Sequence, residues 1–467
     1  MKKIYAVIVS VLLGCIGCFS ACTPKVSGDL KISFYYGGYG ESWGRKLAEK
    51  FTEETGIAVE VDPNPQLQSE VPSMLENGTD SDLIFCHNIK WEVPAARGLI
   101  EPLNDLYTSQ IEDDGVLFSD RVLQSSLAEC RIGDTYYKVP WTNGAGGFVY
   151  NAKMFEDNGW KVPETYDELT ALCKTIYEAK IKVDPDDPRS ATVVPFAWSS
   201  STYYWDYVVF DWWAQLAGIE NINKYKTIAD KTVFDPEGDF KPFVEAVEAW
   251  QDIVAEHPEY SIENSSGTLY TAAQMNFVNG YAAMMPCAQW IESEMRDYID
   301  PEVCVMALMP TPFLKNAKKD KDGNYIRVNF QVGGGDSIII PSCSDNKEAA
   351  KEFLRFLARD ENCKIFTEQT FGVMLGFNYD NLEGIRNKTQ FMDDVFEINK
   401  NSVKFNTYSQ HALALSGKIS LQWPAGGAQM YSELYDDSSI SVPQAFAERY
   451  NQIVNSWDVW MSEAGVE

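Results

Sequence analysis

The chain has 467 residues, of which 45% are hydrophobic, so it is long and apolar enough for one large domain or two smaller ones. Its formal net charge of −29 argues against nucleic acid or an anionic membrane surface as a partner, because both are bound through clusters of Lys and Arg. Many of the 13 Trp and 24 Tyr residues fall in stretches that also contain Gly, Ser and Asn, and these stretches are the first candidates for a ligand site.

The amino terminus has the pattern of a secretory signal. Two lysines precede an apolar run over residues 4–16, which is too short for an ordinary transmembrane helix. The run leads to Ala21 and Cys22, a sequence that resembles a bacterial lipoprotein signal spanning residues 1–22, with Cys22 as the acylated residue. Cys15 follows better lipobox letters, but cleavage there would leave only a short hydrophobic region before it. An uncleaved amino-terminal anchor is the remaining alternative.

The other cysteines and the histidines do not form a recognisable metal site. None of the seven remaining cysteines forms a CxxC pair, and several lie in apolar runs, which favours buried free thiols over a disulfide framework. The chain has three histidines, none at ligand spacing. We therefore expect no metal and no cofactor.

The first predicted elements form a parallel βαβ unit. Residues 30–36 alternate as a strand, a Gly- and Tyr-rich loop follows, a helix stops at Gly56, and residues 57–61 form the next strand. The loop glycines are similar to a dinucleotide-binding fingerprint, but their spacing is one residue too long and aromatic side chains crowd them. We favour a solvated aromatic loop in which Tyr39 and Glu41 are candidate ligand contacts.

Polar and aromatic residues also follow the next strands, where open α/β sheets hold their ligands. A helix over residues 66–77 and a strand over 82–86 are predicted, and a short hairpin strand over 134–141 leads into the Gly-rich stretch 142–147. We interpret that stretch as a flexible crossover between two domains. The candidates from this region are Asn88, Trp91, Trp141 and Asn143.

The second part of the chain opens with a capping box between Thr165 and Glu168, which predicts a helix to about residue 180. A strand over 193–197 leads into the most aromatic stretch of the chain. Its segment 201–206 lacks the spacing of an apolar helix face, so we predict that it lines a site with Tyr204, Trp205 and Asp206.

Residues 271–292 change structural type twice. An apolar stripe predicts a helix, Asn279 and Gly280 stop it, and a strand over 281–285 is predicted to end at Pro286. Gln289 and Trp290 then follow the end of a buried strand. Trp290 is either a stacking platform for a ligand or the edge of a core.

The rest of the chain predicts a strand over 303–309, helices over 345–359 and 362–369, and a final helix over 443–461. Gly-rich stretches around Gly334 and Trp423 read as a second and a third crossover, with Asp336 beside the second.

The order of these pieces resembles family 1 extracellular solute-binding proteins, the lipid-anchored receptors of bacterial ABC importers. The resemblance covers residues 30–457 and rests on FTEETGI (51–57), SDLI (81–84), ARGLIEPL (96–103), YKVP (137–140), VYNAKMF (149–155), FVNGYAAM (277–284) and EAAKEFL (348–354). It implies an α/β, two-lobe, periplasmic-binding-protein-like fold with several interlobe crossovers. We expect residues 29–143 with 338–418 in one lobe, residues 147–332 with 424–467 in the other, and a ligand cleft between them.

The resemblance implies a non-catalytic, monomeric receptor on the outer face of the cell membrane. It would capture a carbohydrate, above all an oligosaccharide, and deliver it to ABC permease subunits. By the family pattern Trp290 lines the cleft. The full set of expected ligand contacts is Tyr39, Glu41, Asn88, Trp91, Trp141, Asn143, Tyr204, Trp205, Asp206, Gln289, Trp290, Gly334, Asp336 and Trp423.

Two other functions stay open at this point. A cell-surface glycoside hydrolase needs a pair of carboxylates across the cleft, which Asp206 and Glu292 could supply. A receptor for a polyamine or another non-sugar solute would use a carboxylate-rich cage, for which Glu41, Asp206 and Asp336 are available.

Overall fold

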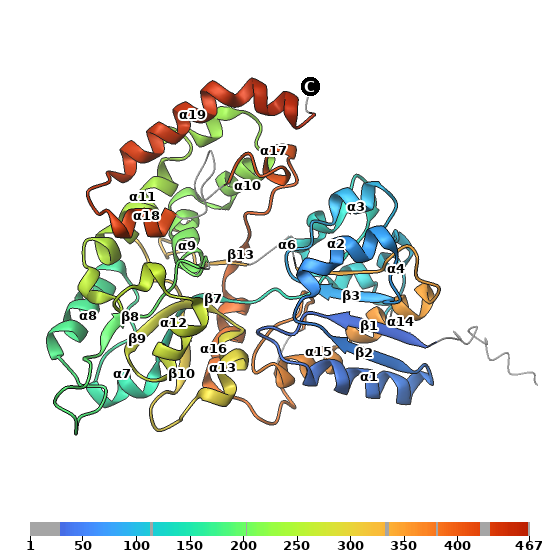
Figure 1. The fold of residues 1–467 in the computed structure, drawn as a ribbon, viewed down its shortest axis with the longest axis horizontal. Coiled ribbons are helices and arrows are strands. Elements are labelled where there is room, and N and C mark those ends of the chain that lie inside the picture. The colour runs from blue at the N-terminus through green and yellow to red at the C-terminus, as the bar shows by residue number, and fades with distance from the viewer. Residues whose placement is uncertain are drawn as a thin grey trace, which may run out of the picture.

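In a computed structural model the chain forms two α/β lobes joined by extended crossovers (Figure 1). The structure describes residues 29–112, 115–201, 203–331, 336–379, 382–420 and 430–465. The predicted acylation site Cys22 and the predicted crossovers at Gly334 and Trp423 lie outside these residues.

The first lobe is built on a five-stranded sheet whose parallel core is the predicted βαβ unit. β1 pairs in parallel with β2 and β3, and α1 ends at Gly56, which adopts the left-handed conformation with φ 75°. β12, from later in the chain, pairs antiparallel with β3 on one side and with β6 on the other, so β6 runs in the same direction as β3. The order of the sheet is β2 (Val59–Pro63), β1 (Leu30–Phe34), β3 (Leu83–Cys86), β12 (Ser337–Ile339) and β6 (Val139–Pro140).

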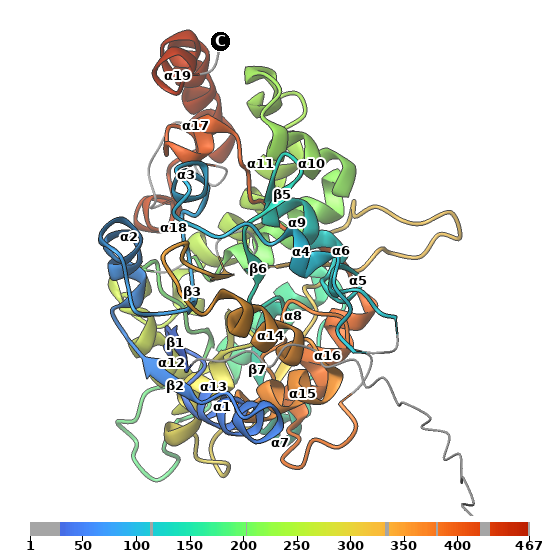
Figure 2. The ribbon, with the colours of Figure 1, turned by 90° about the vertical axis from the view of Figure 1, so that its right-hand side faces the viewer.

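Two helices from late in the sequence complete this lobe. Phe51 of α1 (Ser42–Thr55) packs edge-on against Phe353 and Phe356 of α14, and α15 lies beside α1 (Figure 2). The other elements of the lobe are α2 (Leu67–Asn77), α3 (Glu92–Ala96), α4 (Asn104–Tyr107), α5 (Phe118–Arg121), α6 (Gln124–Leu127), the β4–β5 hairpin (Arg131–Ile132 and Thr135–Tyr136), α14 (Lys347–Leu357) and α15 (Asp360–Gln369).

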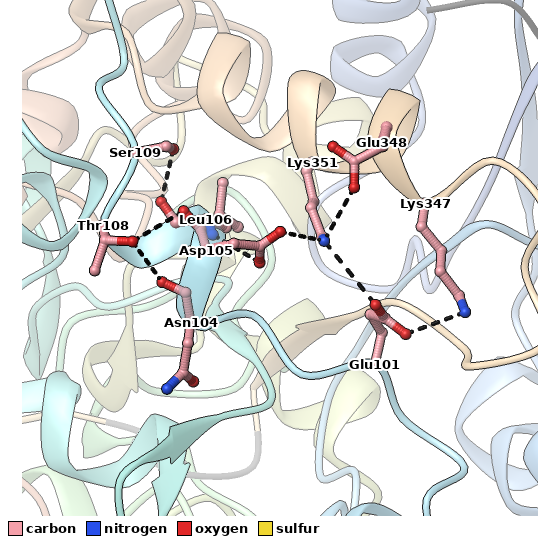
Figure 3. Close-up of polar contacts among 9 residues, drawn as sticks. All are labelled: Glu101, Asn104, Asp105, Leu106, Thr108, Ser109, Lys347, Glu348 and Lys351. Carbon is pink, nitrogen blue, oxygen red and sulfur yellow. Dashed lines mark hydrogen bonds and ion pairs between the residues drawn. The ribbon is translucent and has the colours of Figure 1, made fainter.

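A buried lysine joins α14 to the loop that carries α4 (Figure 3). The Lys351 ammonium lies 2.6 Å from an oxygen of Asp105, 3.2 Å from Glu348 and 3.9 Å from Glu101. Burial acts to lower the pKa of Lys351, but Asp105 and Glu348 more than offset it and the pKa is raised. The late helix is therefore fixed to the early part of the chain by charge as well as by aromatic packing.

The second lobe is built on the four-stranded sheet β10 (Met306–Met309), β7 (Gly146–Asn151), β9 (Ala282–Ala288) and β8 (Val194–Phe196). Pro286 does not end β9, contrary to the prediction; it lies opposite Phe148, and the strand continues to Ala288. The Met284 carbonyl accepts a hydrogen bond from Ala197 N–H, just after β8. The backbone nitrogen of Pro286, two residues later, is directed to the same edge of β9, at a point where β8 has already ended. Its missing N–H therefore breaks no bond of the sheet.

Helices cover both faces of this second sheet (Figure 1). The predicted capping box is present, since Glu168 N–H donates to the Thr165 hydroxyl and Thr165 N–H to the Glu168 carboxylate. The helices of the second lobe, of which α10, α17, α18 and α19 pack on other helices, are α7 (Ala152–Asn158), α8 (Tyr166–Ala179), α9 (Asp206–Ala217), α10 (Ile219–Thr227), α11 (Lys241–Trp250, continued by a π turn over Gln251–Ala255), α12 (Tyr270–Val278), α13 (Ile291–Met295), α16 (Gln390–Asn401), α17 (Ala412–Leu415), α18 (Met430–Asp436) and α19 (Val442–Glu463).

Helix α16 was not predicted, and it packs against the second sheet although the sequence expectation assigned residues 338–418 to the first lobe. The Asp394 carboxylate of α16 accepts a hydrogen bond of 3.0 Å from Leu308 N–H in β10. The chain then forms β13 (Val403–Phe405), which pairs in parallel with β11 (Val328–Phe330). The segment after residue 389 therefore returns to the second lobe.

Six of the seven cysteines among the described residues are buried free thiols, and Cys343 is exposed. In the same part of the chain, no three His, Cys, Asp or Glu residues are grouped closely enough to hold a metal ion. No described helix combines the length and apolar character required to cross a bilayer.

A fully buried carboxylate connects α9 to the strands beside it. Asp211 accepts one hydrogen bond of 2.6 Å from Phe330 N–H and another of 2.7 Å from the Thr311 hydroxyl. Burial raises the pKa of Asp211 well above its usual value, and the two hydrogen bonds and Arg327 oppose this shift only in part. Burial therefore makes the charged form of Asp211 more costly in the folded protein than in the unfolded chain.

We expect the substitution Asp211→Asn, which keeps an acceptor for Phe330 N–H and removes the charge, to leave neutral-pH stability unchanged or increased. A group with a raised folded-state pKa contributes stability below its unfolded pKa and loses it as the pH rises. The advantage of Asp211→Asn should therefore grow as the pH is raised from about 4. Asp211→Ala should lose about 1–3 kcal/mol because the N–H is left unpaired. Urea unfolding at several pH values measures both; an advantage for Asp211→Asn that shrinks with rising pH would contradict the assignment.

Candidate functional site

A cavity of about 320 Å³ lies between the two lobes, at the carboxyl ends of β1 and β3 on one side and of β9 on the other. It is lined by Tyr35, Gly37, Gly38, Tyr39, Gln68, His87, Asn88, Thr142, Asn143, Gly144, Tyr204, Tyr207, Tyr270, Gln289, Trp290, Glu294 and Asp336. Five tyrosines and a tryptophan give it aromatic walls, and amides and carboxylates supply its polar groups.

The first-lobe wall is a chain of hydrogen bonds through Asp336. The Thr142 hydroxyl donates to Asp336 Oδ2 at 3.0 Å, so the hydroxyl of Tyr39, 3.0 Å from Thr142, is the donor in the next bond. His87 Nδ1 lies 2.9 Å from the same Asp336 oxygen. These bonds connect the ends of β3 and β12 with the crossover after β6. They also fix the orientation of the Asp336 side chain through its Oδ2 atom.

Aromatic packing fixes the His87 ring. The ring stacks on Trp141 with a centroid distance of 5.0 Å, and the edges of Tyr35 and Tyr39 contact it at 5.3 and 5.0 Å. Trp141 is fully buried behind this layer. Burial also raises the pKa of Tyr39 well above its usual value, so its phenol stays protonated and keeps its donor role.

The second-lobe wall is an aromatic cluster around Trp290. The indole centroid lies 5.5 Å from that of Tyr207 and 5.9 Å from that of Tyr204. Trp290 is half-buried rather than part of the closed core, and Gly38 of the first lobe faces it across the cavity: a Cβ added at Gly38 would lie 3.5 Å from the Trp290 side chain. The tryptophan is therefore in contact range of both lobes.

Glu294 is the second carboxylate of the cavity. It accepts a hydrogen bond of 2.7 Å from Gln274 Nε2, which also donates to the Tyr204 hydroxyl at 3.1 Å. Burial raises the pKa of Glu294, while the Gln274 bond and the nearby His87 act to lower it. The Gln274 bond orients the carboxylate.

The floor of the cavity is backbone and amide. Gln289 Oε1 accepts from Met374 N–H at 2.7 Å, and the Met374 carbonyl accepts from Asn143 N–H at 3.0 Å. Gly144 lies directly against the Gln289 amide, because a Cβ at Gly144 would be 1.6 Å from Gln289 Oε1. The absence of a side chain at residue 144 is what makes room for Gln289.

Residues 37–362 match the family described as bacterial extracellular solute-binding protein. The chain belongs to this family. It is also 21% identical over 358 residues to the diacetylchitobiose binding protein NgcE of Streptomyces coelicolor, a match that covers 73% of this chain and 68% of NgcE.

Solved structures agree with the fold of this solute-binding protein. RafE from Streptococcus pneumoniae superposes with a TM-score of 0.62 at 16% identity, over 91% of this chain and 98% of RafE. The bacterial solute receptor AcbH gives a TM-score of 0.61 at 16% identity, over 92% of this chain and 99% of AcbH. The two-lobe, periplasmic-binding-protein-like architecture is thus confirmed.

The structure brings half of the predicted contact residues of this solute-binding protein together at the cavity. Those that line it are Tyr39, Asn88, Asn143, Tyr204, Gln289, Trp290 and Asp336. Sequence reasoning missed several others, including His87 and Thr142, although each is next to a predicted residue. Glu294 was missed because it follows Trp290 on the next helix, where no pattern distinguishes it from other surface acids.

Three predicted tryptophans prove to be core residues, and the corresponding contact predictions are wrong. Trp91 is buried in a small core below β3, Trp141 lies behind His87, and Trp205 is fully buried between Phe148 and Trp250. None of them lines the cavity. The side chain of each points to the inside of its lobe.

The predicted acidic contacts need correction as well. Glu41 is exposed and pairs with Arg45 one helical turn later. Asp206 is buried and accepts a hydrogen bond of 2.9 Å from the Tyr431 hydroxyl, and Glu292 accepts one of 2.7 Å from Thr389. Neither Asp206 nor Glu292 lines the cavity, so the carboxylate pair suggested for a hydrolase is absent from it. Of the three carboxylates suggested for a cation-binding cage, only Asp336 lines the cavity.

We expect the substitution Gly144→Ala to displace the Gln289 amide and leave Met374 N–H without its acceptor. The expected cost is about 1–3 kcal/mol in the free energy of unfolding. Gly267→Ala is the matched control, since a Cβ there meets no atom within 4 Å and the backbone is not left-handed. It should change stability by less than about 0.5 kcal/mol. Denaturant unfolding followed by circular dichroism compares the two, and equal stabilities would rule out this packing.

Proposed function

We propose that this chain captures a neutral carbohydrate outside the cell and delivers it unchanged to an ABC importer. The observation that carries the proposal is the interlobe cavity, in which Trp290 and the surrounding tyrosines offer aromatic faces beside Gln289, Asn88, Glu294 and Asp336. Sugar rings place their C–H faces on aromatic rings, and their hydroxyl groups bond to amides and carboxylates.

The charges of the cavity favour a neutral ligand over an acidic one. Glu294 and Asp336 line it, and among the described residues no Lys or Arg does. His87 also lines it, with Nδ1 against Asp336. An acidic sugar would bring its carboxylate into a site whose described lining has two carboxylates and no guanidinium or ammonium group.

The similar proteins support a carbohydrate as the ligand class. The relative NgcE is named for diacetylchitobiose, AcbH is described as preferring galactopyranose, and RafE has been solved with raffinose. A further structural neighbour, GacH of Streptomyces glaucescens, is described in complex with acarbose. These are binding proteins rather than enzymes, which supports a receptor without catalytic residues.

The signal-like sequence at the amino terminus supports attachment of the receptor to the membrane. We infer that residues 1–22 are a lipoprotein signal and that Cys22 carries the lipid, which would hold a monomeric receptor near its permease subunits on the outer face of the membrane. The family of extracellular solute-binding proteins supports the outer location.

We expect wild-type protein to show a saturable change in tryptophan fluorescence with a neutral oligosaccharide from a panel that includes diacetylchitobiose, raffinose and acarbose. Trp290→Ala should weaken the affinity about fivefold to tenfold in calorimetry, because one aromatic platform contributes about 1–1.4 kcal/mol. Trp290→Phe should retain part of the affinity. Trp160→Ala, which removes a tryptophan away from the cavity, should bind as wild type.

Mass spectrometry of the sugar after binding separates a receptor from a hydrolase. Intact glycan is the expected result, and cleavage products would overturn the proposal. Tight binding of a uronic acid oligosaccharide in preference to neutral sugars would contradict the inference about charge.

We expect Cys22→Ser to abolish metabolic labelling of the protein with an alkyne fatty acid in a bacterial host, because the serine hydroxyl cannot replace the thiol that accepts the lipid. Cys15→Ser is the control and should be labelled as wild type. Loss of label in Cys15→Ser together with retention in Cys22→Ser would move the acylation site to Cys15.

A further inference from the structure

A second cavity, of about 360 Å³, lies at the junction of the lobes. One wall is the loop after α15, where Asn378 N–H donates to the Arg121 carbonyl and Phe377 packs on Phe118 in the first lobe. The other wall is the end of α16 and β13, which belong with the second lobe and contribute Lys400 and Lys404. The cavity is thus formed by both lobes.

Met374 lies between this cavity and the first cavity, around Trp290, which we call the sugar cavity. Its backbone bonds to Gln289 and Asn143 at the floor of the first cavity, and Met374 also lines the second. The two cavities have no lining residue in common. The second cavity is therefore a distinct site and not an extension of the first.

The charges of the second cavity are opposite to those of the first. Lys400 and Lys404 line it, and no Asp or Glu among the described residues does. Neither lysine forms a salt bridge with a described carboxylate, in a protein whose net charge is −29. Lys404 is half-buried, and burial lowers its pKa with no counter-charge to oppose the shift.

Hydrogen-bond donors accompany the two lysines. Asn399 Oδ1 already accepts a bond of 3.1 Å from Gln331 Nε2, so the amide NH₂ of Asn399 is the part left for a ligand. A partly buried ammonium without a counter-ion is costly, and a bound anion with several oxygen acceptors would remove that cost.

We propose that this second cavity binds a small oxyanion such as phosphate, held by Lys404 and Lys400 with Asn399 as a further donor. The site is separate from the sugar cavity and does not depend on which sugar the protein binds. Lysine suits this role because its ammonium is a compact charge with three donors.

The test is titration of the sugar-free protein with inorganic phosphate at constant ionic strength, maintained with NaCl. We expect the thermal midpoint of the wild type to rise by about 2 °C at phosphate concentrations near ten times the dissociation constant. Calorimetry should show Lys404→Met weakening phosphate binding about tenfold or more, and Lys400→Gln weakening it to a smaller extent.

Lys46→Met is the matched control, because Lys46 is exposed on α1 and lines neither cavity. It should bind phosphate as wild type does. Absence of a phosphate effect on the wild type beyond that of NaCl would overturn the proposal, as would equal phosphate affinities in Lys404→Met and Lys46→Met. Since Lys404→Met removes a partly buried charge and keeps an aliphatic side chain, we expect it to fold, and Lys400→Gln tests the site at an exposed position.

Discussion

The structure depends on the backbone of residues 142–147, where the chain leaves the first sheet and enters the second. Every residue of this segment is buried. A Cβ at Gly146 would lie 2.2 Å from the Tyr207 ring, and one at Gly147, whose φ is 151°, would lie 2.8 Å from the Met309 carbonyl oxygen. Only glycine tolerates such close approach and such a backbone conformation. The aromatic and amide groups of the second lobe can therefore pack directly against the crossover, and this contact forms the floor of the sugar cavity.

The same segment shows what a single sequence can and cannot predict. The run of glycines correctly marked a crossover between lobes, but it was interpreted as flexible, since Gly-rich stretches without partners are commonly linkers. The partners are Gln289 and Tyr207, which are far away in the sequence and carry no signal of this contact. Close packing against a glycine depends on the tertiary structure, so the residues next to it in the sequence do not reveal it.

Most of the elements that local rules predicted are present, and the failures have physical reasons. The βαβ unit, the Gly56 stop and the Thr165 capping box depend on nearby residues and were confirmed. Helix α16 was missed although Thr389 caps it by accepting from Met392 N–H, because four of its 12 residues are Asp or Asn, which favour caps and turns over helix interiors. At the site, strand ends correctly indicated the region of the cavity. They could not tell Trp290, which faces the cavity, from Trp205, which faces the core, because each lies directly before a helix of the second lobe.

Charge separates the two cavities at the lobe junction more clearly than shape does. In the sugar cavity the carboxylates are held by neighbouring side chains, with Gln274 donating to Glu294 and Thr142 to Asp336. Each carboxylate has further lone pairs, so these hydrogen bonds orient it and still leave acceptor sites free. The hydroxyl groups of a sugar can donate to these free sites. In the second cavity Lys404 has no described counter-ion. A protein with a large negative net charge thus places two lysines without a described salt-bridge partner at the lobe junction. Met374, which lines their cavity, bonds through its backbone to Gln289 of the sugar cavity.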